Sequence, residues 1–295
     1  MPLVNKVLDA TRIRHVLSFD VEDWYQGFLS RRIGGWQDTP SREADIVDHI
    51  LELLQEARVS ATFFVLGQFA EREPAVVSKI ARAGHEVASH GYAHKPLRSF
   101  SQESFRSDLK RSIDVLENII GDKVIGHRAT SWSLMKSSLW ALETMAELGL
   151  RYDSSIFPTS FHKFGLPSSP PYPHRIVLDS GNWLTEFPAQ VLSVGLLRIP
   201  AAGGFYLRAL PLVFSKAALK QSERRRSHGM VYLHPYDLDA DVPRIKVPLA
   251  FRVIRYYNLG KTETYLRSLL SSFRFSPIKD LLSSITASLP VTQIR

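Results

Sequence analysis

Two histidines four residues apart are the first residues of this chain whose types and spacing could do chemistry. His90 and His94 lie in the run Ser-His-Gly-Tyr-Ala-His over residues 89–94. Two imidazoles and one carboxylate are the minimum protein ligand set of a metal site that keeps a position open for hydrolysis. Because Gly91 interrupts the run, we expect it to lie on a loop that enters a helix rather than inside a helix.

Three acidic residues could complete such a site. Asp20, Glu22 and Asp23 directly follow the apolar run over residues 15–19. If the strand continues past Asp20, side-chain alternation places Glu22 on the same face as Asp20 and turns Asp23 away. If the strand ends at Asp20, the shorter Asp23 can reach inward from a loop. We slightly favour Asp23 as the metal carboxylate and keep Glu22 as the alternative.

The segments around these residues alternate between strand and helix patterns. Strands are expected over residues 15–19, 61–66, 85–88, 123–127, 151–152 and 230–233. Helices are expected after Ser41 as N-cap, from Pro74 to Gly84, from a capping box of Ser99 and Gln102 to Ile119, and from about Ser137 to Gly149. Residues 157–184 lose the pattern and are expected to form a long loop or insertion. The alternation predicts an α/β fold of parallel strands with helices outside.

Polar residues follow almost every predicted strand. In chain order they are Asp20, Glu22, Asp23, His90, His94, Arg128, Asp153 and His234. Because the carboxyl ends of parallel strands meet at one edge of the sheet, we expect these side chains to share one mouth.

Length and composition narrow the class of protein. The 295 residues suffice for one large α/β domain or two ordinary ones. The chain has no cysteine, which excludes disulfides, thiolate metal sites and a cysteine nucleophile. Residues 1–14 lack the apolar core of a secretory signal, and no apolar run approaches the roughly 18 residues of a membrane span. A cytoplasmic protein is the simplest expectation.

The formal net charge of +8 is concentrated at the C-terminus. From residue 244 to residue 295, nine Lys or Arg stand against two acidic residues. Such a tail could dock on anionic lipid headgroups or on an acidic substrate. The simpler expectation is that it packs on the main domain through Leu266, Leu269, Leu270, Phe273 and Phe275. Nucleic acid is not an expected partner, because the rest of the chain is near neutral.

Five motifs carry a resemblance to a known family. They are LSFDVEDW over residues 17–24, SHGYAH over 89–94, GHRATSW over 126–132, YDSS over 152–155 and LHP over 233–235. In order and spacing they resemble the polysaccharide deacetylases, the NodB-homology or carbohydrate esterase family 4 enzymes. Thr130 stands where that family usually has proline, and the family's adjacent Asp-Asp is here separated. Residues 203–208 and the tail resemble the subgroup with a C-terminal extension that is associated with exopolysaccharide and exosortase gene clusters.

The resemblance implies a distorted barrel of seven or eight parallel strands, in a domain over residues 15–240. Residues 1–14 would form an N-terminal segment, and residues 241–295 would form a basic extension packed on or beside the barrel. This extension could contact the anionic inner face of a membrane or polysaccharide-synthesis machinery. The implied activity is metal-dependent removal of N-acetyl groups from amino sugars of a polysaccharide or its lipid-linked precursor. Zinc is the expected metal, with cobalt, nickel and manganese as alternatives.

The resemblance also implies a role for each residue at the mouth. His90, His94 and one carboxylate would hold the metal. Asp20 would be the general base and His234 the general acid, Arg128 would orient Asp20, and Asp153 would fix Arg128 in turn. A backbone N–H within residues 152–155 could stabilise the oxyanion.

Two other functions stay open at this point. A catalytically silent member would bind polysaccharide or act as a scaffold, and a relative of another kind would hydrolyse small amides without a metal. Trp24, Trp132 and Trp183 could form a sugar-stacking platform, although buried aromatic residues are commoner. We expect His85, beside a glycine and ahead of a strand, to be structural.

Overall fold

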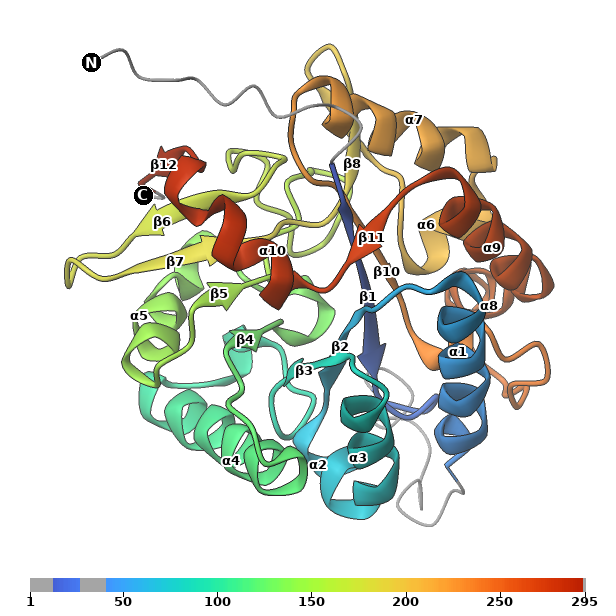
Figure 1. Cartoon of the computed structure of the whole chain (residues 1–295), viewed down its shortest axis with the longest axis horizontal. Coiled ribbons are helices and arrows are strands. Elements are labelled where there is room, and N and C mark those ends of the chain that lie inside the picture. The colour runs from blue at the N-terminus through green and yellow to red at the C-terminus, as the bar shows by residue number, and fades with distance from the viewer. Residues whose placement is uncertain (1–12, 27–40, 294–295) are drawn as a thin grey trace.

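A mostly parallel sheet of ten strands forms the centre of the protein (Figure 1). The structure is a computed structural model that describes residues 13–26 and 41–293, so most of the expected N-terminal segment lies outside the described residues. The strands of this sheet are β1 (His15–Val21), β2 (Thr62–Val65), β3 (Glu86–Ser89), β4 (Gly126–His127), β5 (Tyr152–Asp153), β6 (His174–Val177), β7 (Trp183–Glu186), β10 (Met230–Leu233), β11 (Phe275–Ser276) and β12 (Val291–Thr292).

The strands of the sheet are ordered β10-β1-β2-β3-β4-β5-β7-β6-β12. β6 is antiparallel to β7, and the other strand pairs of the sheet are parallel. The expected α/β architecture of the distorted-barrel type is therefore confirmed. Among the described residues the barrel is open, because no pairing joins β10 to the β6 and β12 edge. A separate hairpin consists of β8 (Val191–Val194) and β9 (Leu197–Pro200).

Helices pack around the outside of the sheet (Figure 1). They are α1 (Glu43–Ala57), α2 (Gly67–Arg72), α3 (Pro74–Arg82), α4 (Gln102–Ile120), α5 (Trp140–Glu147), α6 (Gly204–Ala209), α7 (Leu212–Arg224), α8 (Leu249–Tyr256), α9 (Thr262–Ser272) and α10 (Ile278–Ile285). Each of α1, α3, α4 and α5 buries an apolar stripe, as the 3.6-residue period predicts.

Two predicted helix starts are wrong in detail. Ser41 is not the N-cap of α1, since Arg42 holds that position and the Ser41 hydroxyl donates to the Glu43 carboxylate instead. The capping box of α4 is formed by Ser101 and Ser104 rather than by Ser99 and Gln102. In both helices several polar residues precede the first turn, and local spacing alone does not choose among them.

The segment predicted as a long loop contains two strands. The chain runs without a regular element from residue 157 to residue 173, and then forms the β6–β7 hairpin, whose register pairs Ile176 with Leu184. Both of these side chains are buried. The strands were missed because prolines and serines dominate the sequence around them.

The C-terminal extension is built into the sheet. β11 pairs in parallel with the amino half of β1, and Leu266, Leu269, Phe273 and Phe275 lie in the same core cluster as the barrel residues. In this structure the tail therefore packs on the main domain. Its apolar residues complete the core at the amino end of β1.

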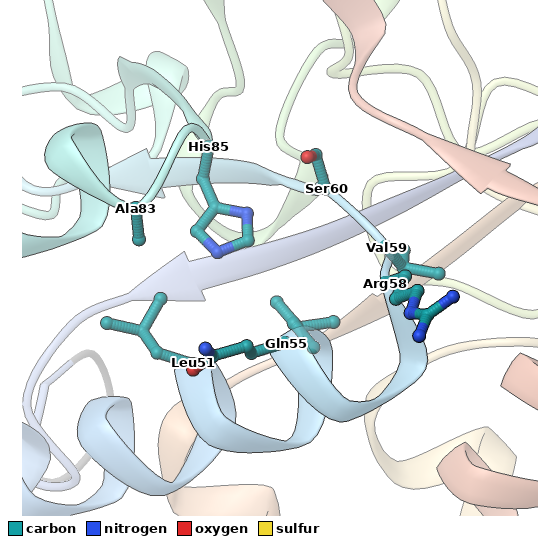
Figure 2. A pocket seen from close by; sticks show the side chains of 8 residues that line it. Leu51, Gln55, Arg58, Val59, Ser60, Ala83 and His85 are labelled. Atoms are coloured by element: carbon teal, nitrogen blue, oxygen red, sulfur yellow. The ribbon is translucent and has the colours of Figure 1, made fainter.

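A pocket on the opposite side from the strands' carboxyl ends lies between the end of α1 and the start of β3 (Figure 2). His85 is one of its lining residues, and its Nδ1 accepts a hydrogen bond from the Ala61 N–H at 3.2 Å. Burial, with a smaller effect of Lys279, lowers the pKa of His85 to about 4. His85 is thus a neutral histidine that satisfies a backbone donor, in keeping with the structural role expected for it.

Candidate active site and metal centre

Glu22, His90 and His94 form the one potential metal-binding cluster of at least three histidine or acidic side chains within the described residues. One ligand atom from each lies within 4.8 Å of the others. The Oε2 atom of Glu22 is 3.6 Å from Nε2 of His90 and in close contact with Nε2 of His94. Glu22 and His90 are buried, and His94 is mostly buried. Two imidazole nitrogens and a carboxylate oxygen converge here from segments almost 70 residues apart.

Glu22, and not Asp23, is the carboxylate that reaches the histidines. β1 extends through Val21, so the side chains at 20 and 22 share one face of the strand. Asp23 is fully buried on the other side and pairs with Arg72 at 2.5 Å. Asp23, which we slightly favoured, is therefore turned away from the histidines, and Glu22 lies on the face where the alternation argument places it.

The histidines are oriented by a tight loop that follows β3. Gly91 has φ +79° and His94 has φ +47°, so the backbone turns through the left-handed region twice. The loop leads to a short 3-10 helix (Leu97–Ser99) and not directly into an α-helix. His90 donates its Nδ1–H to the Arg128 carbonyl at 2.8 Å, so its Nε2 is the ring nitrogen that faces Glu22.

The donor set fits a divalent cation. The Oε2 atom of Glu22 is buried and has no hydrogen-bond partner among the described residues. Burial raises the pKa of Glu22, but the adjacent imidazoles of His94 and His90, with a smaller contribution from the charge of His234, outweigh it and hold the pKa well below its usual range. An ionised carboxylate beside two imidazoles, with no thiolate in the chain, is a ligand set that suits zinc and other first-row divalent metals.

Asp20 lies beside this cluster and is paired with Arg128. Oδ1 of Asp20 lies 2.5 Å from Nη1 of Arg128, and both side chains are buried. The guanidinium of Arg128 also lies over the rings of Phe64 and Trp132, 4.0 and 4.3 Å from their centroids. A planar cation held between aromatic faces is fixed in orientation, so it fixes Asp20 in turn.

Ser154, which the sequence reasoning missed, makes the contact that we expected of Asp153. Arg128 donates to the Ser154 hydroxyl at 3.0 Å and to the Ser154 carbonyl at 3.3 Å. Asp153 instead accepts a hydrogen bond from Ser155 at 2.5 Å and lies 3.5 Å from Nδ1 of His127. Asp153 therefore contacts Arg128 only indirectly, through Ser155. The Ser155 hydroxyl accepts the N–H of Ala129, the residue directly after Arg128.

His234 faces Asp20 and Glu22 from the end of β10. Its Nε2 lies 4.0 Å from a carboxylate oxygen of each. Its Nδ1 is bonded to Asp237 at 2.9 Å, and Asp237 in turn pairs with Arg208 at 3.0 Å. Burial lowers the pKa of His234, but the hydrogen bond and charge of Asp237, together with the other carboxylates, raise it overall.

Four residues at this end of the site were not predicted. Asp237 was detectable in principle, since it stands three residues after His234 in a turn opened by Pro235. Arg208 lies in a motif that we noted without assigning it a role. Tyr236 stacks on the His234 ring and Arg255 lies over Tyr236. No local sequence pattern pointed to either residue.

The expected platform of tryptophans is not supported, and the expected oxyanion donor stays a prediction. Trp24 and Trp132 are buried, and Trp183 stands at the amino end of β7, away from the mouth, so the three do not form a platform. Within the expected oxyanion segment, the N–H groups of Tyr152 and Ser154 already donate to backbone carbonyls.

The chain matches two protein-family models in succession. Residues 35–152 match "Polysaccharide deacetylase" and residues 154–283 match a domain of unknown function, DUF3473. No helix among the described residues is long and apolar enough to cross a membrane.

Three curated relatives with similar sequences are named as deacetylases. A chitooligosaccharide deacetylase from Rhizobium leguminosarum bv. trifolii is 31% identical over 183 residues, which are 55% of this chain and 82% of the relative. A peptidoglycan-N-acetylglucosamine deacetylase from Bacillus cereus is 29% identical over 34% of this chain and 37% of the relative. A Helicobacter pylori peptidoglycan deacetylase is 24% identical over 56% of this chain and 55% of the relative. The chain thus spans 37% of the length of the Bacillus cereus relative and 55% of the length of the Helicobacter pylori relative.

Solved structures share the fold. A putative polysaccharide deacetylase from Mycobacterium smegmatis has a TM-score of 0.68 and 22% identity, over 98% of this chain and 96% of that one. A family 4 pseudoenzyme from Bacillus anthracis has a TM-score of 0.51 and 14% identity, over 97% and 71%. The Rhizobium relative is 31% identical to this chain and is matched over 82% of its own length. This chain therefore belongs to the polysaccharide deacetylase family, in the subgroup that carries a C-terminal extension.

Proposed function

We propose that this protein removes N-acetyl groups from amino sugars of a polysaccharide or of its lipid-linked precursor. The observation that carries the proposal is the convergence of Glu22, His90 and His94 beside the ion-paired Asp20, with His234 at 4.0 Å on the other side. These side chains supply the ligands, a base and an acid within one mouth.

Glu22, His90 and His94 would hold a divalent metal, with zinc as the first expectation and cobalt, nickel or manganese as alternatives. Such a metal lowers the pKa of a bound water and polarises an acetyl carbonyl. Three protein ligands leave open positions for both groups.

Asp20 would accept the proton of the attacking water. Its Oδ1 is tied to Arg128, which leaves Oδ2 directed toward His234 and the space in front of the histidine pair. A buried carboxylate that is paired with a buried, rigid arginine is held in one orientation.

His234 would give a proton to the departing amine. Asp237 holds Nδ1, so the Nε2–H is the one that faces the reacting groups. The raised pKa of His234 keeps this imidazole protonated to a higher pH than an isolated histidine. Amide cleavage needs this proton, because an amide anion is a poor leaving group.

The test is release of acetate from an N-acetylglucosamine oligosaccharide by the purified protein supplied with zinc. We expect turnover by the parent, no turnover by Asp20→Asn with its metal retained, and loss of the metal from His90→Ala. Full acetate release by Asp20→Asn would disprove the assigned base. A metal-loaded parent that releases no acetate would favour the silent, glycan-binding alternative, and activity that survives a chelator would favour the metal-independent one.

A further inference from the structure

The outward face of α8 is apolar. Of its eight residues only Tyr256 is buried. Leu249, Val253 and Ile254 are 74%, 43% and 49% exposed, and Tyr257 directly after the helix is 51% exposed. At about 100° per residue, the three aliphatic side chains fall within an arc of about 140°. A surface helix normally turns polar residues toward solvent, whereas α8 turns these aliphatic side chains toward solvent.

Basic residues surround this apolar face. Residues 242–262 include five Lys or Arg and no acidic residue. Arg244, Lys246, Arg252 and Lys261 are exposed. Aliphatic side chains with cations around them, on a helix too short to span a bilayer, are the features of a helix that lies in the plane of an anionic membrane surface.

The charge distribution also favours a membrane over a second copy of the chain. In a two-fold contact through α8, each copy would bring its cations against the same cations of its partner. Like charges set face to face oppose such a contact, whereas an anionic lipid surface is complementary to them.

α8 is tied to the mouth of the site by its inner side. Arg255 donates to the Trp24 carbonyl, and its guanidinium lies 3.6 Å from the ring centroid of Tyr236, the neighbour of His234. Arg208, which holds Asp237, also donates to the Ile254 and Tyr257 carbonyls at 2.9 and 3.0 Å. A surface that binds the outer face of α8 therefore lies close to the catalytic mouth.

We infer that α8 and its flanking cations dock the protein on an anionic bilayer, with the mouth of the site held near the lipid surface. The docking itself does not depend on the reaction. Its consequence, that an N-acetylated glycan carried on a lipid is the favoured substrate, rests on the proposed function.

The experiment is co-sedimentation of the full chain with vesicles of phosphatidylcholine containing about 30% phosphatidylglycerol. We expect binding to these vesicles, weaker binding to pure phosphatidylcholine, and loss of binding at about 0.5 M salt. The paired change Leu249→Ala with Val253→Ala should weaken binding about tenfold or more, because it removes apolar side chains that enter the lipid while alanine keeps the helix. Arg252→Gln should weaken it about fivefold.

A matched control is Leu196→Ala, which truncates a fully exposed leucine at the β8–β9 turn. It should bind like the parent. Equal losses from Leu196→Ala and the α8 pair, or no loss from the α8 pair, would overturn the proposal. So would a dimer seen by light scattering without lipid that the α8 pair dissociates.

Acetate release from a soluble oligosaccharide separates the two proposals. The α8 pair should release acetate at the parental rate, since neither side chain reaches the mouth. Vesicle binding without any acetate release would support the docking proposal and contradict the proposed function. Acetate release without vesicle binding would do the reverse.

Discussion

The Tyr236 ring lies flat on the His234 imidazole, with centroids 4.5 Å apart and planes 11° apart. The Arg255 guanidinium lies over the same tyrosine ring, 3.6 Å from its centroid. His234 is thus held by Asp237 at its edge and by Tyr236 on its face. The residues that position the proposed acid come in part from the C-terminal extension.

Replacing Tyr236 by leucine should lower kcat about threefold to tenfold with little change in KM, because an aromatic stack contributes about 0.5–1.5 kcal/mol beyond its buried area. Tyr236→Phe keeps the ring and should recover most of the rate. Steady-state kinetics on a soluble oligosaccharide would measure both. If leucine and phenylalanine cost the same, the hydroxyl near Glu22 matters and the stack does not.

Glu22→Gln should lower metal affinity by at least about tenfold, because an amide oxygen is a much poorer ligand than an ionised carboxylate. The neighbouring Asp23→Asn is the matched control. It should keep the metal but lose about 1–3 kcal/mol of stability, since it removes the partner of Arg72. Elemental analysis of the purified variants, with urea unfolding, would check both. Loss of metal from Asp23→Asn alone would reverse the assignment.

Arg128→Lys should reduce kcat about a hundredfold while metal content stays the same. Lysine keeps the charge but cannot donate to Asp20 and Ser154 at once from a rigid plane. Ser154→Ala removes one hydrogen bond and should cost about tenfold or less. A lysine variant with parental turnover would show that the charge alone suffices.

Removal of the metal should abolish acetate release, and added zinc should restore it. The same addition should raise the melting temperature, because a ligand that binds only the folded state at about a hundred times its Kd stabilises that state by about 2.7 kcal/mol. His94→Ala should show no such thermal shift. If zinc leaves the melting temperature of the parent unchanged, the cluster is not a metal site.

Stability should fall as the pH drops from about 6.5 toward 4. Burial lowers the pKa of His85, His162 and His174 to about 4 each. The unfolded chain, whose histidines titrate near 6.5, therefore binds these protons more tightly than the folded chain, so acid favours unfolding. Each such histidine should cost roughly 1–2 kcal/mol at pH 5.

His85→Asn tests one of these contributions. The asparagine carbonyl can accept the Ala61 N–H that Nδ1 now accepts, but it does not titrate. The variant should lose less stability than the parent between pH 7 and pH 5 in urea unfolding. If the variant and the parent lose the same free energy of unfolding between pH 7 and pH 5, His85 has no such role.

Strand ends and their polar residues were predictable because the signals are local. The residues after β1, β3, β4 and β10 do meet at one edge of the sheet, as parallel strands require. Asp20, His90, His94, Arg128 and His234 were all placed at this mouth from their positions along the chain. The order and spacing of the five motifs carried the family resemblance.

The sequence alone therefore determined which residues gather at the mouth, and the tertiary structure decided how they pair. Glu22 replaced Asp23 because β1 keeps its pairing with β2 as far as Val21 and Val65, and that length fixes which face each side chain takes. Arg208, Tyr236 and Arg255 joined the site because segments tens of residues apart pack together there. Periodicity and capping act within a few turns of chain, whereas such contacts depend on which surfaces meet when the whole chain folds.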